Sequence, residues 1–200
     1  MLAGGGDTIP PKGYRLVKYV TVSSGNVWFP TGIYNTDEWT LDCMVKYTSL
    51  NARILFGAWY SNTYWTGYGL NLNYGGSRSV HGNKYSSSMF TTINVTDSKI
   101  KCVCTRTSCS VTWEGVTQTA SSSEGFNGEQ IYILGNGVTV TAGTGTGMSE
   151  TTITRGGVEV AHFYPCVRES DNKPVFWNSV TKTDIENTGS GVAGVIELSA

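Results

Sequence analysis

Apolar and polar residues alternate along most of this 200-residue chain, in short runs separated by glycine, asparagine and serine. In the segment WTLDCMVKYTSL (39–50), the alternation places four apolar side chains on one face of a strand: Trp39, Leu41, Cys43 and Val45. No run of apolar residues keeps a helical spacing for more than a turn or two. The pattern predicts about a dozen short strands, as is typical of an all-β protein with two packed antiparallel sheets.

The same alternation defines the other elements. The expected strands cover residues 14–22, 27–34, 39–50, 52–60, 68–76, 88–96, 99–105, 109–120, 130–137, two strands around the RGG turn within 150–167, then 174–185 and 194–198. Residues 1–13 (MLAGGGDTIPPKG) precede these strands. They are rich in glycine and proline, and Leu2 is the single large aliphatic residue before Ile9. We therefore expect residues 1–13 to form an extended arm and residues 14–200 to form one β-sandwich domain.

Charge excludes two classes of partner. Only 14% of the residues are charged and the net charge is −1, so the chain lacks the positive patch that nucleic acid or an anionic membrane surface requires. No segment approaches the roughly 20 apolar residues of a membrane span. The first residues also lack the basic and apolar regions of a signal peptide. We expect no nucleic-acid partner, no membrane insertion and no secretory signal.

Three of the five cysteines lie within KIKCVCTRTSCSVTW (99–113). Cys102 and Cys104 are two residues apart on an expected strand and share one face. Cys104 and Cys109 flank the turn-like TRTS and could face each other across a hairpin. Because no CxxC pair and no nearby histidine completes a metal site, reduced and partly buried thiols are favoured. A disulfide and a metal site stay open as alternatives.

The acidic residues and histidines do not form a recognisable catalytic group. A glycosidase needs two carboxylates that face one sugar, but Asp42, Glu114 and Glu159 are isolated in the sequence. His81 and His162 have no serine or cysteine partner in a recognisable nucleophile motif. The sequence therefore predicts a protein that is not an enzyme and has no catalytic residues.

Oxygen ligands for calcium are present without a diagnostic spacing. Asn71, Asn73 and Asp97 could contribute to a site of the kind that some β-sandwich lectins use. We predict no cofactor and no metal site, and a structural calcium ion stays open.

The segment WYSNTYWTGY (59–68) concentrates large aromatic side chains among residues that favour loops. We expect it to connect two neighbouring strands. Four of its residues are the predicted ligand or partner contacts: Tyr60, Tyr64, Trp65 and Tyr68. A sugar, a neighbouring subunit and the domain's own core are the three alternatives for what these rings contact.

Two longer segments resemble a known family. The stretch VKYVTVSSGNVWFPTGIYNTDEWTLDCMVKYTSLNARILFGAW (17–59) is similar to the opening of concanavalin A-like (laminin G-like) jelly-roll modules in phage and prophage structural proteins. The stretch VEVAHFYPCVRESDNKPVFWNSVTKT (158–183) is similar to the closing signature of those modules. It departs from that signature at Pro174-Val175, where the family prefers glycine, and at Trp177-Asn178, where the family has Tyr-Asp. The resemblance implies a jelly-roll sandwich of the concanavalin A-like lectin/glucanase type.

Within the closing segment, three residues are predicted to build a structural turn: Arg168, Ser170 and Asp171. Ser170 and Asp171 can accept backbone N–H groups, and Arg168 can pair with Asp171 or Glu169.

The resemblance also implies a function. It indicates a non-enzymatic virion protein, made in the host cytoplasm, that decorates the capsid or is associated with the tail or a fibre. Its expected partners are other virion proteins, in an oligomeric or particle-attached state, with host-surface glycans as a further candidate. The alternative is a stand-alone carbohydrate-binding module, and a glycan hydrolase ranks third.

Overall fold

The protein is all-β in the part of the chain that the computed structural model describes, which comprises residues 9–46, 54–61, 66–74, 77–82, 86–90, 97–123, 125–137 and 142–199. The strands are β1 (Tyr14–Leu16), β2 (Tyr19–Ser24), β3 (Phe29–Tyr34), β4 (Trp39–Lys46), β5 (Ile54–Ser61), β6 (Thr66–Tyr74), β7 (Ser77–Gly82), β8 (Ser86–Phe90), β9 (Ser98–Cys104), β10 (Ser108–Trp113), β11 (Val116–Ser121), β12 (Gln130–Ile133), β13 (Gly147–Arg155), β14 (Val158–Arg168), β15 (Lys173–Asn178), β16 (Thr183–Glu186) and β17 (Val192–Ile196).

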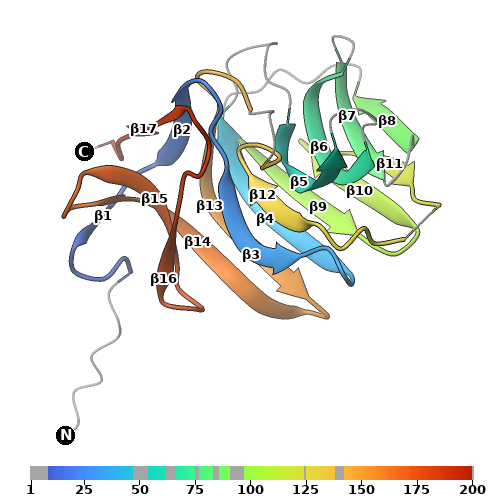
Figure 1. Ribbon diagram of the computed structural model, residues 1–200. Coiled ribbons are helices and arrows are strands. Elements are labelled where there is room, and N and C mark those ends of the chain that lie inside the picture. The colour runs from blue at the N-terminus through green and yellow to red at the C-terminus, as the bar shows by residue number, and fades with distance from the viewer. Residues whose placement is uncertain are drawn as a thin grey trace, which may run out of the picture.

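These strands form two antiparallel sheets that pack face to face, which confirms the predicted β-sandwich (Figure 1). Sheet A contains 11 strands, with the main order β11-β10-β9-β4-β13-β14-β15-β16. Sheet B contains six strands in the order β3-β12-β5-β6-β7-β8. The finer expectation of a jelly-roll topology stays a prediction.

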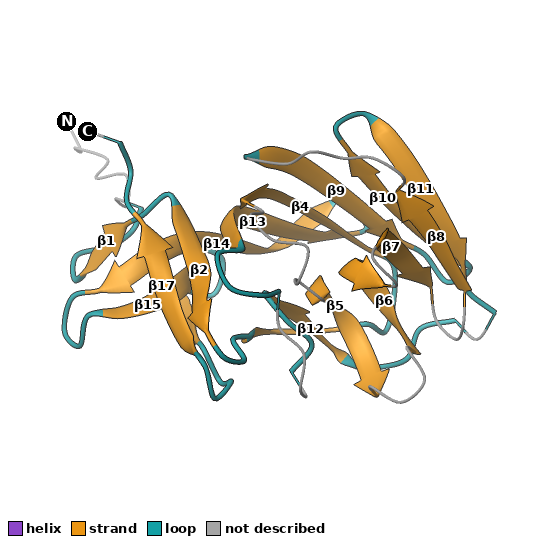
Figure 2. Cartoon of the chain, turned by 90° about the horizontal axis from the view of Figure 1, so that it is seen from above, coloured by secondary structure: helices purple, strands orange, loops and turns teal. Residues whose placement is uncertain are grey.

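Sheet A branches at β13. One edge of β13 pairs with β4 from Gly147 to Thr154. The other edge is shared, because Gly147 and Met148 pair with β2 whereas Thr151 to Arg155 pair with β14. As a result β1, β2, β15 and β17 gather at the end of the sandwich away from β8 and β11 (Figure 2).

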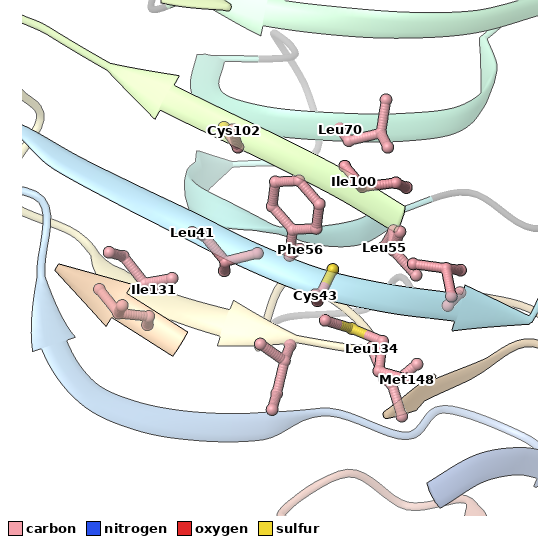
Figure 3. Packing of buried hydrophobic residues seen from close by; sticks show 14 of the residues in the cluster. Leu41, Cys43, Leu55, Phe56, Leu70, Ile100, Cys102, Ile131, Leu134 and Met148 are labelled. Atoms are coloured by element: carbon pink, nitrogen blue, oxygen red, sulfur yellow. The ribbon is translucent and has the colours of Figure 1, made fainter. Parts of the chain in front are cut away.

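The core lies between the two sheets and is built from alternate residues of the strands. All four side chains predicted to share one face of β4 are buried: Trp39, Leu41, Cys43 and Val45. Figure 3 shows side chains of β4 and β9 against Phe56 of β5 and Leu70 of β6. Burial of large apolar side chains, at about 1.5–3 kcal/mol each, is the main stabilising contribution to such a fold.

Three expected strands are each two strands in the structure. Residues 14–22 divide into β1, which pairs with β14, and β2, which pairs with β13 and β17. Residues 109–120 form the hairpin of β10 and β11, and residues 174–185 contain the hairpin of β15 and β16. The alternation continues across each short connection, and the connection from β1 to β2 includes the buried Val17, so the pattern does not show where one strand ends.

Pro165 is not at a strand end, as its missing N–H would suggest, but inside β14. It lies between Phe163, which pairs with β13, and Cys166, which pairs with β1. The Pro165 carbonyl accepts the Val17 N–H at 3.0 Å, so its nitrogen points to the same edge of β14. On this edge the partner of β14 changes from β13 to β1 at Pro165. A proline is tolerated there because no N–H group is needed for a hydrogen bond between strands.

Asn35, at the connection from sheet B to sheet A, is fully buried and joins the two sheets. Its Oδ1 accepts the Trp39 indole N–H at 2.7 Å, and its Nδ2 donates to Asn127 Oδ1 at 2.7 Å. The Asn127 amide in turn donates to the Ala58 carbonyl of β5 at 3.0 Å. Since a buried polar group is costly only when it has no partner, this chain of bonds stabilises the connection.

We expect Asn35→Ala to lower the free energy of unfolding by about 2–4 kcal/mol, because it leaves the buried Trp39 indole N–H without its partner and removes the hydrogen bond to Asn127 Oδ1. Urea denaturation measures the change. The exposed neighbour provides a control, since Thr36→Ala should change stability by less than about 0.5 kcal/mol. Equal effects of the two substitutions would show that the Asn35 network contributes little.

Candidate contact surface

The outer face of sheet A is formed by the residues of β4, β9 and β13 that alternate with the core residues. We call this surface the outer face and define it by nine residues: Thr40, Asp42, Met44, Lys99, Lys101, Val103, Glu150, Thr152 and Thr154. Two of its apolar side chains are open to solvent, with Met44 41% exposed and Val103 36% exposed. The outer face therefore combines charges of both signs with exposed apolar groups.

Two shallow hollows lie along the outer face. One, of about 280 Å³, is lined by Asp42, Cys43, Met44, Lys99, Glu150 and Thr152. The other, of about 160 Å³, is lined by Glu38, Trp39, Thr40, Val103, Cys104, Thr105, Thr154, Gly156 and Gly157. In the first, three charged side chains from three strands meet one exposed methionine, which suits a partner with both polar and apolar groups.

His162 of β14 lies beside the first hollow and is held in place by neighbours. Its Nε2 lies 2.5 Å from Glu150 Oε1, and its Nδ1 lies 3.3 Å from Glu159 Oε1. The imidazole also stacks on Tyr164, with 4.4 Å between ring centroids. Because a carboxylate faces each ring nitrogen, the arrangement fixes the orientation of the ring.

The predicted structural turn is present after β14. The Arg168 guanidinium donates to both oxygens of Asp171, at 3.1 and 2.6 Å, and Asp171 accepts the Lys173 N–H at 3.3 Å. Sequence reasoning missed two further partners of Arg168, namely Asp184 at 2.9 Å and Glu186 at 2.6 Å. Both lie on β16, so the arginine joins the turn to the next hairpin. Ser170 lies in the same turn.

The network shifts the ionisation of its members. Hydrogen bonding to Arg168 lowers the pKa of Asp171 to about 2. Hydrogen bonds from Arg168, and then from Lys173, also lower the pKa of Glu186. A lowered pKa is expected for a carboxylate whose ion pair stabilises the folded state.

In the aromatic segment 59–68, the position of Tyr68 differs from the predicted contact role. Tyr64 and Trp65 lie outside the described residues, as does the side chain of Tyr60, so their role as contacts stays a prediction. Tyr68, in contrast, is completely buried and is not on a contact surface. Its hydroxyl lies 2.5 Å from Ser122 Oγ and donates to the Gly125 carbonyl at 2.8 Å, because β6 turns this ring toward sheet A.

Of the three residues considered for calcium, only the side chain of Asp97 is described. Its carboxylate accepts Lys18 Nζ at 2.8 Å and the Tyr19 hydroxyl at 3.0 Å. The Asn71 and Asn73 side chains lie outside the description. Asp97 therefore pairs with Lys18 of the protein itself. This geometry does not support a calcium ion at these residues.

The three cysteines of the β9–β10 hairpin form a cluster in the core. Cys104 Sγ lies 2.7 Å from Cys109 Sγ, and Cys102 Sγ lies 3.6 Å from each of them. The thiols are fully buried rather than partly buried as expected. Three thiol groups this close are potential ligands of a soft metal ion and also a potential site of thiol oxidation.

No protein-family model matches the chain, and no curated protein matches it. In the part of the chain that is described, no helix is long and apolar enough to cross a membrane.

The Arg168 network generates a prediction about pH. The folded-state pKa values of Asp171 and Glu186 lie below those of the unfolded chain, so the stabilisation is present above about pH 5 and is lost as the pH falls toward 2. We expect Arg168→Met to lower the urea midpoint at pH 7, and to lower it much less at pH 2.5.

Arg15→Met is the matched control, since Arg15 makes a single pair with Glu197 and both side chains are about half exposed. The midpoint of this variant should stay close to that of the wild type throughout. A loss of stability in Arg168→Met that does not depend on pH would contradict the role assigned to the ion pairs.

Proposed function

We propose that this chain is a non-enzymatic structural component of a phage or prophage virion, attached to the capsid as a decoration or to the tail or a fibre. The resemblance of residues 17–59 and 158–183 supports the proposal. In the fold these two segments are brought together, because β2, β4 and β14 all pair with β13. The two segments thus meet in sheet A through these strands, while β3 and β5 of the first segment lie in sheet B.

The observation that carries the proposal is the outer face. Strands β4, β9 and β13 leave their outward side chains exposed or half buried, so this side of sheet A is open in the described structure. Exposed apolar side chains set among polar and charged ones are typical of surfaces that bind other proteins. Met44 and Val103 are the exposed apolar groups, and the register places the charged Asp42 and Lys101 side chains between them.

A protein neighbour fits the outer face better than a sugar does. Sugar-binding surfaces present a flat aromatic ring, whereas the exposed apolar groups here are aliphatic. Tyr164, on the adjacent strand β14, is stacked on His162. A glycan contact through Tyr60, Tyr64 and Trp65 is the alternative, and it corresponds to a stand-alone carbohydrate-binding module.

The N-terminal segment gives a second point of attachment. Tyr14 donates its N–H to the Pro11 carbonyl at 3.2 Å, and the Gly13 carbonyl accepts the Glu169 N–H at 2.9 Å. Ile9, the first of the described residues, is 45% exposed. We propose that residues 1–13 extend from the edge strand β1 onto a neighbouring subunit.

If the outer face binds a virion neighbour, the double variant Met44→Glu and Val103→Glu should fold normally but lose at least about tenfold in incorporation into particles. Two buried, unpaired carboxylates easily exceed the 1.4 kcal/mol that a factor of ten requires. Val192→Glu is the control, because Val192 is 60% exposed on β17, away from the outer face. Co-sedimentation with assembled particles measures incorporation, and thermal melting measures folding.

Undiminished incorporation of the double variant would contradict the proposal. Binding of the wild-type chain to purified polysaccharides, with no binding to particles, would favour the carbohydrate-binding alternative. Release of reducing ends from those polysaccharides would show that the chain is an enzyme.

Deletion of residues 1–13 should leave the melting temperature nearly unchanged, because the backbone hydrogen bonds that it removes among the described residues are those accepted by the Pro11 and Gly13 carbonyls. The same deletion should abolish incorporation into particles. A truncated protein that enters particles as well as the full chain does would show that this segment is not an anchor.

A further inference from the structure

The cysteine cluster of the β9–β10 hairpin contains three possible disulfide pairs, and the strand register distinguishes them. Cys104 and Cys109 are directly opposite each other. The next pair toward the turn is hydrogen-bonded, since the Thr105 N–H donates to the Ser108 carbonyl at 2.8 Å. Cys104 and Cys109 therefore form a non-hydrogen-bonded pair, whose Cα atoms are about 4.5 Å apart in antiparallel sheets. That separation lies within the range of disulfides.

The other two pairs fit a disulfide poorly. Cys102 and Cys104 are two residues apart on β9, so their Cα atoms are about 6.5–7 Å apart and their side chains point in parallel rather than toward each other. Cys102 is opposite Val111, so Cys109 is its diagonal neighbour, at about 7–8 Å. A Cα separation above about 7 Å cannot be bridged without movement of the backbone.

The distances between sulfur atoms agree with the register. Cys104 Sγ and Cys109 Sγ are 2.7 Å apart, closer than either is to Cys102 at 3.6 Å. A small movement brings this one pair to bonding distance. A metal ion bound by all three sulfurs would instead need the sulfurs about 4 Å apart, since metal–thiolate bonds are about 2.3 Å long. The geometry thus favours oxidation over metal binding.

Cys109 has the surroundings of a nucleophile. Burial by itself raises the pKa of the Cys109 thiol, but hydrogen bonds from Cys102, Cys104 and the Gly69 amide outweigh this effect and lower it. Burial raises the pKa of the Cys102 and Cys104 thiols. In the closed hairpin, Cys109 is therefore the thiol of the three that most readily forms a thiolate.

We propose that Cys104 and Cys109 form a disulfide across the β9–β10 hairpin when the protein meets a low-molecular-weight disulfide, and that Cys102 stays a free thiol. In the open hairpin, the thiolate of one member of the pair attacks one sulfur of the small disulfide, forms a mixed disulfide and releases one small thiolate. The other member, after losing its proton, then attacks the protein sulfur of the mixed disulfide and releases the second small thiolate. Two protein thiols are oxidised and one small disulfide is reduced to two thiols.

Access to the cluster determines when the reaction takes place. All three sulfur atoms are buried, whereas Arg106 and Thr107 in the adjoining turn are exposed. The reaction therefore needs the hairpin to be open, during folding or in a local opening that begins at the turn. Once closed, the bond links residues that are already in register and restricts the unfolded chain.

Refolding the full chain with oxidised glutathione tests the proposal. The intact mass should fall by two hydrogen atoms, and peptide mapping should join Cys104 to Cys109 and leave Cys102 open to alkylation after unfolding. The melting temperature should rise by about 5 °C relative to protein refolded with dithiothreitol. Cys102→Ala should keep the mass change and the shift, whereas Cys104→Ala and Cys109→Ala should lose both.

The peptide map of the wild-type chain decides the question even where a variant does not fold. A bond that includes Cys102, or no bond at all, would overturn the proposal. So would stoichiometric copper or zinc in the purified protein, protected from chelators and released when the thiols are alkylated.

Discussion

The structure depends on the way β13 divides one of its edges between two partners. Its first residues pair with β2 and its later residues pair with β14, while β4 occupies the whole of the other edge. The division requires a close approach at Gly147, where an added Cβ would lie 2.9 Å from Thr21 and 3.1 Å from Tyr19. A register shift between Met148 and Thr151 then turns the strand from one partner to the other.

This branch gives the two sides of sheet A different surroundings. At the β14–β15 end both sides are covered, with Phe163 and Phe176 in the main core and Cys166, Val175 and Trp177 in a second cluster beneath Tyr14. At the β4–β9 end only the inner side is covered, which leaves the outer face open. The same sheet therefore provides a doubly packed region that includes β1 and β17, and a region whose outer side is open among the described residues.

Much of the fold follows from local pattern. The alternation in β4 and β9 identifies their buried faces correctly, because one side of each strand is largely apolar and the other is polar except at Met44 and Val103. Pairing over long distances does not follow from such a pattern, so neither the divided edge of β13 nor the contacts of Arg168 with Asp184 and Glu186 could be predicted. The burial of Tyr68 does not follow from local sequence either, since a tyrosine beside a loop and a tyrosine in a core have the same local sequence. The outer face cannot be recognised in the sequence, because its members are exposed residues from three separate strands.

The central claim is that sheet A presents its outer face to another virion protein, and localising the chain in a particle tests it most directly. Phage particles would be purified from cells that encode the chain, analysed by mass spectrometry and imaged by cryo-EM. The account predicts that the chain is present in a fixed ratio to the capsid or tail protein, with β4, β9 and β13 against a neighbouring subunit. A chain that is missing from the particles, or whose outer face points into solvent in every copy, would contradict it.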